Sequence, residues 1–350
     1  MTNFLVDSDK KLTNLSSKLK NVTEIGLDTE FIRESTYRPI LALIQISLPD
    51  NDIYLIDPLS VNNKELIAEI MDNINLIKII HSSKQDLEAI YNYLGSFPKN
   101  IFDTQIANNF IYEKSNVGYS SLVKSLFDID IKEGSWRTNW LERPLSEKKK
   151  EYAADDVRYL IEAKKILTER LCNLERLSWF NEEQNNELKK SNIILDPKDA
   201  WEKINYPLYF ETSEINILKS IACWREKLAI KYNVPKKWIL SDSLLIKLIT
   251  TNENKSQEII NNIRQKILAE EISEIKKIVL GGKKPKNKNL NPDKNVESKC
   301  YEVLLSIADK YHIDSTIIAN KRDIEIFSTF NKNTRFMKGW RYQIFGKLVQ

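Results

Sequence analysis

Two carboxylates lie two residues apart, directly after a short apolar run near the start of the chain. Asp28 and Glu30 follow Ile25-Gly26-Leu27, which is typical of the end of a buried strand. Since residues i and i+2 of a strand project to the same side, both acids would face one point in space. Such a pair fits a divalent cation, which also takes water and substrate phosphate oxygens as ligands. A strand that leaves the core through two solvated acids has the same pattern, so the hypothesis depends on further carboxylates.

Asp86 is the third candidate acid. It lies about three residues into a helix that the spacing of Leu87, Ile90 and Leu94 predicts. The alternative is structural, because Ser83 with Asp86 matches a capping box and a carboxylate in the first turn is favoured by the helix dipole.

Tyr152 and Asp156 form a second candidate pair, within a helix expected over residues 147–171. At a spacing of i and i+4 the phenol and the carboxylate share one helical face. Asp155 points elsewhere. An acidic pair solvated among neighbouring lysines and arginines is the alternative, and periodicity does not decide which aspartate matters.

Composition bounds the class of protein. A chain of 350 residues with 42% apolar residues is long enough for two or three domains. The net charge of +4 and the pI near 8.6 permit an anionic partner without requiring one. Three widely spaced cysteines without a CxxC pair argue against a zinc site or a disulfide framework and favour a reducing compartment. The sequence shows no secretory segment and no apolar stretch near the roughly 20 residues that span a bilayer. We therefore expect a soluble cytoplasmic protein that does not enter a membrane and has no obligate protein partner.

Secondary-structure patterns divide the chain into two parts. Up to about residue 180, apolar runs at 25–27, 41–46, 53–56 and 77–80 alternate with helical segments. Asn51 and Asp52 are residue types that favour turns, and they predict a hairpin between the second and third runs. Beyond residue 181 almost every segment has a helical pattern, and we expect the apolar stripes there to form cores.

Taken together, the acids form a specific pattern. Asp28-Thr29-Glu30-Phe31, Asp86 behind His81, and Tyr152 with Asp156 resemble the three motifs of the DEDD exonucleases. Tyrosine four residues before the final aspartate is typical of the tyrosine subfamily. The resemblance is closer to the ribonuclease D family, and it extends over these segments: Leu43-Ile44-Gln45, Ile56-Asp57-Pro58, Phe102-Asp103-Thr104-Gln105 and Trp140-Leu141-Glu142-Arg143-Pro144-Leu145-Ser146.

This resemblance implies the fold class and the domains. The expected fold is an α/β RNase H-like exonuclease core with a mixed sheet, whose first three strands form an antiparallel meander, followed by all-α HRDC-type domains. The expected division is a 3′–5′ exonuclease domain at 1–180, a linker at 181–207, a first HRDC domain at 208–280, a basic linker at 281–295, and a second, divergent HRDC-like domain at 296–350.

The resemblance also implies the chemistry. Asp28, Glu30, Asp86 and Asp156 would hold two divalent ions, Mg²⁺ or Mn²⁺, because four converging carboxylates repel one another unless cations neutralise them. Tyr152 would orient the attacking water. The substrate would be RNA with a free 3′ end, such as tRNA precursors, cleaved to nucleoside 5′-monophosphates.

Three further residues are candidates for substrate contacts. Phe31 would stack on the terminal base, with core packing as the alternative. His81 would reach a phosphate or sugar unless it is a buried structural histidine, and Gln105 would hydrogen-bond the terminal nucleotide. Lys283, Lys284, Lys286 and Lys288 of the basic linker are candidates for phosphate contacts, with a merely solvated connector as the alternative.

Other functions are weaker interpretations. A DNA-directed 3′–5′ exonuclease would use the same acids. A catalytically silent nucleic-acid-binding module on this fold is disfavoured because all four acids and Tyr152 are present. A helicase would need a GxxxxGK[ST] loop, which the chain lacks. A Ser-His-Asp hydrolase is disfavoured because the only histidines are His81 and His312 and no GxSxG motif occurs.

Overall fold

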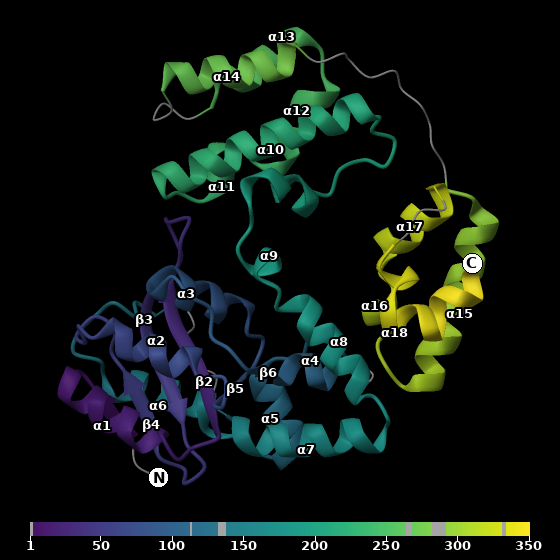
Figure 1. The fold of residues 1–350 in the computed structure, drawn as a ribbon. Coiled ribbons are helices and arrows are strands. Elements are labelled where there is room, and N and C mark those ends of the chain that lie inside the picture. Colours follow the sequence, from purple (N-terminus) through teal and green to yellow (C-terminus); the bar gives the residue numbers. More distant parts are fainter. Residues whose placement is uncertain (1–2, 113, 132–137, 264–267, 282–291, 331–333) are drawn as a thin grey trace. The chain divides into compact units, whose positions relative to one another are not determined.

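A mixed β-sheet organises the first half of the chain. The structure, a computed structural model, describes residues 3–112, 114–131, 138–263, 268–281, 292–330 and 334–350 (Figure 1). Within these residues the sheet has six strands in the order β1-β4-β3-β2-β5-β6. Their bounds are β1 Asn3–Val6, β2 Glu24–Ile32, β3 Ile40–Ser47, β4 Ile53–Ile56, β5 Ile77–Ile80 and β6 Ile101–Asp103.

The pairing confirms the predicted mixed sheet. β2, β3 and β4 form the antiparallel meander, and β5 and β6 add in parallel on the other side of β2. The sequence patterns missed β1, which pairs in parallel with β4 at the edge. This strand has four residues, and Phe4 is 38% exposed, so the segment lacks the continuous apolar run of the other strands.

Helices cover both faces of the sheet. One core lies between the sheet and α1–α3, with Leu12, Leu27 and Leu87 among its fully or almost fully buried members. The opposite core includes Leu43 and Val157, as the two-residue alternation of a strand requires. The helices of this region are α1 Asp9–Leu19, α2 Lys64–Asp72, α3 Lys84–Leu94, α4 Thr104–Asn109, α5 Tyr119–Phe127, α6 Glu147–Arg158, α7 Leu160–Asn173, α8 Leu177–Glu187 and α9 Lys190–Ile193.

The helix expected over 147–171 is two helices. α6 ends at Arg158, α7 begins at Leu160, and Tyr159 lies between them. The backbone N–H of Tyr159 donates to the hydroxyl of Tyr119 at 3.0 Å. The Tyr119 side chain of α5 therefore accepts a hydrogen bond from the backbone at the junction of the two helices. No periodicity in the 147–171 segment predicts this contact.

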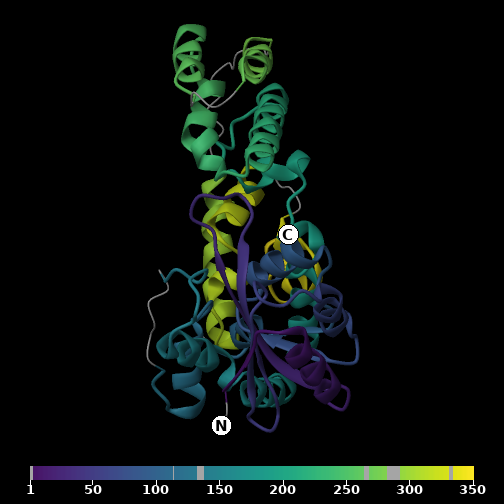
Figure 2. The ribbon, with the colours of Figure 1, turned by 90° about the vertical axis from the view of Figure 1, so that its left-hand side faces the viewer.

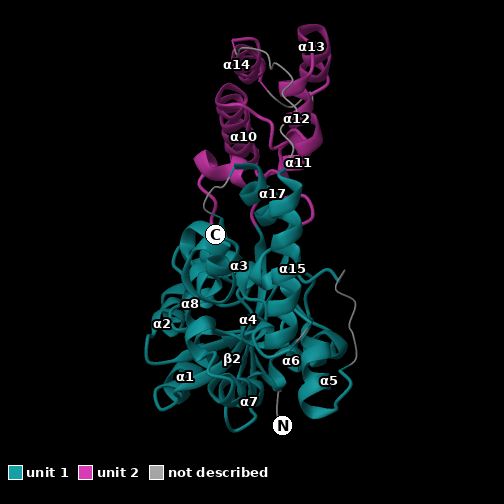
Figure 3. Cartoon of the chain, turned by 90° about the vertical axis from the view of Figure 1, so that its right-hand side faces the viewer, with its two compact units in different colours: residues 1–32, 39–193, 292–350 teal, residues 33–38, 194–291 magenta. Residues whose placement is uncertain are grey.

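The chain forms two compact units (Figure 3). The first contains residues 1–32, 39–193 and 292–350, so it includes the C-terminal helices together with the sheet. These helices are yellow-green and yellow in Figures 1 and 2. Their bounds are α15 Lys294–Tyr311, α16 Ser315–Ile318, α17 Lys321–Phe330, η2 Arg335–Met337, α18 Gly339–Arg341, η3 Tyr342–Gly346 and α19 Lys347–Val349.

Polar residues of α8 attach the C-terminal helices to the sheet region. Glu183 accepts two hydrogen bonds from the Arg341 guanidinium, at 2.6 and 2.5 Å, and one from Trp340 Nε1 at 3.1 Å. The rings of Trp179 and Trp340 stack with centroids 5.4 Å apart. The segment at 181–187, which its polarity assigned to a linker, is helical because its acids and amides bind other elements. Most of the predicted basic linker, including its four candidate lysines, lies outside the described residues.

The second unit is helical and contains residues 33–38 and 194–291. Trp224 and Ile221 lie in its core, and Ile260 and Ile263 lie there too, so the predicted stripes form a core. The loop at 33–38, between β2 and β3, belongs to this unit because Tyr37 donates a 2.5 Å hydrogen bond to Glu226. The elements are η1 Pro197–Lys203, α10 Thr212–Tyr232, α11 Lys236–Ile239, α12 Asp242–Thr250, α13 Glu253–Asn261 and α14 Ala269–Leu280. Among all described residues, no helix is long and apolar enough to cross a membrane.

Candidate active site

β2 presents Asp28 and Glu30 on the face of the sheet opposite α1–α3. Ile25 and Leu27 are fully buried in the core beneath those helices. The alternation of the strand therefore turns Asp28 toward the other face, and Glu30 follows two residues later. Both acids are partly exposed, as residues that receive a ligand from solvent must be.

The close approach of α6 to β2 brings in Asp156. A Cβ built on Gly26 would lie 2.9 Å from the carbonyl oxygen of Val157 and 2.2 Å from Ser47 Oγ, so glycine is required at this position. Ser47 Oγ in turn donates to the Val157 carbonyl at 2.7 Å. The sheet thus holds the last turn of α6 directly, with Asp156 next to the anchored residue.

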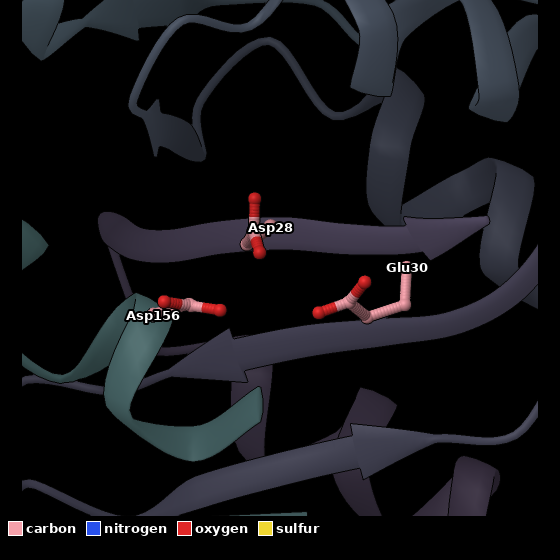
Figure 4. Close-up of side chains that lie close together, drawn as sticks. All are labelled: Asp28, Glu30 and Asp156. Carbon is pink, nitrogen blue, oxygen red and sulfur yellow. The ribbon is translucent and has the colours of Figure 1, made fainter. Parts of the chain in front are cut away.

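Three carboxylates converge as a result. One oxygen each from Asp28, Glu30 and Asp156 lies within 4.8 Å of the other two. Figure 4 shows the carboxylates of Glu30 and Asp156 facing one another beside Asp28. An all-oxygen donor set of this kind suits a hard divalent cation.

The structure also decides between the two neighbouring aspartates of α6. Asp155 accepts a 2.8 Å hydrogen bond from Arg158 Nε, whereas Asp156 turns to the cluster. The choice that periodicity left open therefore follows from the packing of α6 on β2.

Asp86 lies beside this trio and is held by the same motif. Its Oδ1 accepts a 2.6 Å hydrogen bond from Thr29 Oγ1, and its side chain is almost fully buried. The capping-box alternative is wrong, because Ser83 makes no side-chain cap to α3. Ser83 Oγ donates instead to Asp103 at 2.7 Å. Asp86 therefore has no capping-box role, and its charge acts on both Asp28 and Glu30.

Mutual repulsion and burial set the charges of these acids. Burial, followed by the charges of Asp156 and Asp86, raises the pKa of Glu30 to about 9. Burial chiefly raises the pKa values of Asp86 and Asp156 to about 7. The pKa of Asp28 lies well above its ordinary value, because of burial and then the charge of Asp86. Without a cation the cluster therefore holds protons near neutral pH, which is the electrostatic profile of a cation-binding site.

Tyr152 lies one turn before Asp156 and hydrogen-bonds to it. Burial and the surrounding carboxylates raise the pKa of the phenol, so its hydroxyl keeps its proton. The ring lies 6.0 Å from that of the buried Trp140, which fixes its position. The hydroxyl therefore acts as a neutral hydrogen-bonding group at the edge of the cluster.

An ion pair holds the segment that leads into α6. Arg143 makes two hydrogen bonds to Asp57, at 2.6 and 2.8 Å, and donates to the carbonyls of Ala42 and Trp140 at 2.7 Å. Asp57 is 2% exposed. Two motifs whose contacting residues are 86 positions apart thus meet, and the contact fixes the segment before α6 against β3 and the end of β4.

The candidate substrate contacts have structural partners. His81 Nε2 donates to the Val117 carbonyl at 2.9 Å, and its Nδ1 bonds to Thr104 Oγ1 at 2.9 Å. Gln105 Nε2 donates to the same carbonyl at 3.0 Å. Phe31 is partly buried and packs against the core beneath α1–α3. These positions agree with the structural alternatives for His81 and Phe31, and contact with substrate remains a prediction for all three residues.

Sequence reasoning missed Tyr119 at the start of α5. Its ring lies 5.7 Å from that of His81, and its hydroxyl accepts from Tyr159 N at the junction of α6 and α7. The charges of Asp156 and Asp28 contribute to raising its pKa, after burial, so it lies near both acids. No spacing rule connects Tyr119 to the other site residues in the sequence.

Comparisons with known proteins agree with this geometry. The family model described as 3′-5′ exonuclease matches residues 3–172. A curated ribonuclease D from Bartonella henselae is 32% identical over 95% of this chain and 85% of its own length. The chain belongs to the ribonuclease D family. A second relative of that name, from Desulfotalea psychrophila, is 28% identical over 99% of this chain and 97% of its own length.

The fold of a solved member of the ribonuclease D family covers the whole chain. The crystal structure of Escherichia coli RNase D matches with a TM-score of 0.82 and 22% identity, over 100% of this chain and 98% of that one. The predicted fold class is therefore confirmed. As a ribonuclease D family member of the DEDD type, the chain is a 3′–5′ exoribonuclease.

Proposed function

We propose that this enzyme trims the 3′ ends of structured RNA, such as tRNA precursors, and releases nucleoside 5′-monophosphates by hydrolysis. The observation that supports it most is the convergence of Asp28, Glu30 and Asp156 within 4.8 Å. The solved E. coli relative is described as an exoribonuclease involved in structured RNA processing, and we extend that substrate class to this chain.

Asp28, Glu30, Asp86 and Asp156 would hold two divalent ions, Mg²⁺ or Mn²⁺. The oxygen donors and the raised pKa values of these acids fit that role, since a bound cation removes the repulsion that now favours protonation. When bound, the ions acidify the attacking water and stabilise the attacking and leaving oxygens.

Tyr152 orients the attacking water. Its hydroxyl is bonded to Asp156 and remains neutral. When the hydroxyl proton points at the Asp156 carboxylate, the phenolic oxygen keeps lone pairs that accept a hydrogen bond from a water molecule. The water is then fixed with an oxygen lone pair directed away from Tyr152, toward the phosphorus of the terminal nucleotide.

The helical unit of residues 194–291 would hold the body of the RNA while the single-stranded 3′ end enters the site. Its α10 exposes Lys219 and Lys227, and α14 exposes Lys277. Lysines of this kind make phosphate contacts whose strength falls with salt. The HRDC-type interpretation of this unit supports the same role.

A labelled-substrate experiment tests the proposal. Purified protein should shorten a 5′-labelled tRNA precursor in single-nucleotide steps, EDTA should stop the reaction, and Mn²⁺ or Mg²⁺ should restore it. A matched DNA strand should be degraded more slowly. Faster loss of DNA, or cleavage that begins at internal positions, would contradict the proposal.

A further inference from the structure

Gln45 has an unusual environment in the middle of β3. Its side chain is fully buried, and neither Nε2 nor Oε1 has a hydrogen-bond partner among the described residues. Buried side-chain amides are nearly always hydrogen-bonded, and a buried amide without partners destabilises the fold that contains it. An apolar side chain of similar size would fill this position without that cost, so the amide points to a role in a ligand-bound state.

The strand register places Gln45 next to Asp28. The two residues are direct partners in the antiparallel pairing of β2 and β3. Directly opposite residues project to the same face with Cβ atoms about 4.5 to 5.5 Å apart. The preceding pair, Gly26 with Ser47, lies on that same face and contacts the Val157 carbonyl of α6. Gln45 therefore lies beneath α6, within reach of the Asp28 carboxylate.

A neutral side-chain donor of this kind would add to the backbone hydrogen bond that Thr29 gives to Asp28. Its close neighbours Glu30 and Asp156 offer oxygen acceptors. When these acids are ionised they cannot donate a hydrogen bond, so they do not fix the orientation of the Asp28 carboxylate. Carboxylates that bind metal ions are usually held by a hydrogen bond from a neighbouring residue, which fixes their orientation.

We propose that Gln45 is a positioning residue for the metal site, whose Nε2–H donates to the Asp28 carboxylate when Asp28 binds a divalent cation. This inference rests on the proposed metal-binding role of Asp28. In the metal-free protein the Gln45 amide stays without a partner. Binding of the cation orients the Asp28 carboxylate so that it accepts the hydrogen bond from Gln45 Nε2.

Mn²⁺ titration of the full chain without RNA tests this proposal, because it measures binding independently of catalysis. Gln45→Met, which keeps the length of the side chain, should weaken Mn²⁺ binding about 10- to 100-fold. The melting temperature of the metal-free protein should stay the same or rise. Gln45→Leu is the second variant and should give the same pair of results. The matched control is Thr168→Val, because Thr168 Oγ1 in α7 is another buried atom without a partner among the described residues; its Mn²⁺ affinity should be that of the wild type.

Two results would overturn the proposal. One is wild-type Mn²⁺ affinity in either Gln45 variant. The other is a large fall in the metal-free melting temperature, or failure to fold, in both variants, which would assign Gln45 to the fold. Asp28→Asn in the same titration separates this inference from the proposed function. If Asp28→Asn binds Mn²⁺ as tightly as the wild type, the proposed metal site is wrong. If Asp28→Asn loses Mn²⁺ binding while both Gln45 variants keep it, only the proposed role of Gln45 is wrong.

Discussion

Thr29 Oγ1 donates a 2.6 Å hydrogen bond to Asp86 Oδ1. The hydroxyl of the middle residue of the Asp28-Thr29-Glu30 motif thus holds an acid 57 positions later in the chain. The strand segment presents Asp28 and Glu30 on one face of the sheet. The side chain of Thr29, on the opposite face, holds the third acid, Asp86. This contact explains why a hydroxyl residue is useful between the two acids.

Thr29→Val should lower kcat/KM on RNA by about tenfold, because a hydrogen bond to a charged group contributes about 1.5 to 3 kcal/mol. Thr29→Ser keeps the hydroxyl and is the matched control. Steady-state kinetics on a labelled RNA would check both. Equal activity of the valine variant and the wild type would mean that Asp86 needs no such support.

Gly26→Ala should reduce both stability and activity. The added Cβ would meet the Val157 carbonyl at 2.9 Å and Ser47 Oγ at 2.2 Å, so α6 must move away from β2 and take Asp156 with it. Overpacking of this kind costs about 1 to 3 kcal/mol, measurable by urea unfolding. Gly118→Ala is the control, since a Cβ there meets nothing within 4 Å. An unchanged Gly26→Ala protein would contradict the proposed packing of α6.

The metal-free protein should lose stability as pH rises through the cluster's titration range. The pKa of Glu30 is raised from 4.5 to about 9, so the folded state binds more protons than the unfolded state between these values, and the free energy of unfolding falls with rising pH. Glu30→Gln removes this contribution. Its free energy of unfolding relative to the wild type should therefore increase from pH 5 to 9, by at most about 1.4 kcal/mol per pH unit.

Urea unfolding in EDTA at several pH values would measure this difference. Repeating it in Mn²⁺ should reverse the trend for the wild type, because the cation binds the deprotonated acids. A difference between Glu30→Gln and the wild type that does not vary with pH would mean that Glu30 titrates normally.

Tyr152→Phe should lower kcat by about 100-fold, because the attacking water loses the hydrogen bond that orients it and misplacement of a reacting group costs about that much. Mn²⁺ affinity should change little, since the phenol binds Asp156 and belongs to no ligand set in our account. Turnover on RNA and Mn²⁺ titration would be measured on the same preparation. A parallel loss of both would show that Tyr152 acts only by holding Asp156.

Local patterns in the sequence predicted the parts of the site that depend on local geometry. The two-residue period of a strand placed Asp28 and Glu30 together, and the four-residue spacing on a helix placed Tyr152 with Asp156. The resemblance to a known family then joined Asp86 to them. Such rules act over a few residues, which is why the meander and these pairs were predictable.

Features that depend on distant contacts were not predictable in this way. The choice of Asp156 over Asp155 follows from how α6 packs on Gly26. Ser83 looked like a helix cap but bonds to Asp103, and the polar residues of α8 looked like a linker but bind the C-terminal helices. In each case a polar side chain has a partner far away in the sequence, and a local pattern assigns it to solvent.

We propose that the carboxylate cluster at Asp28 binds the ions with which this enzyme removes nucleotides from RNA. The most direct test is the rate at which purified Asp28→Asn shortens a 5′-labelled RNA with a free 3′ hydroxyl, in saturating Mg²⁺ or Mn²⁺. We expect almost complete loss of activity in a protein that is folded and no less stable than the wild type without metal. Undiminished shortening by Asp28→Asn would contradict the account.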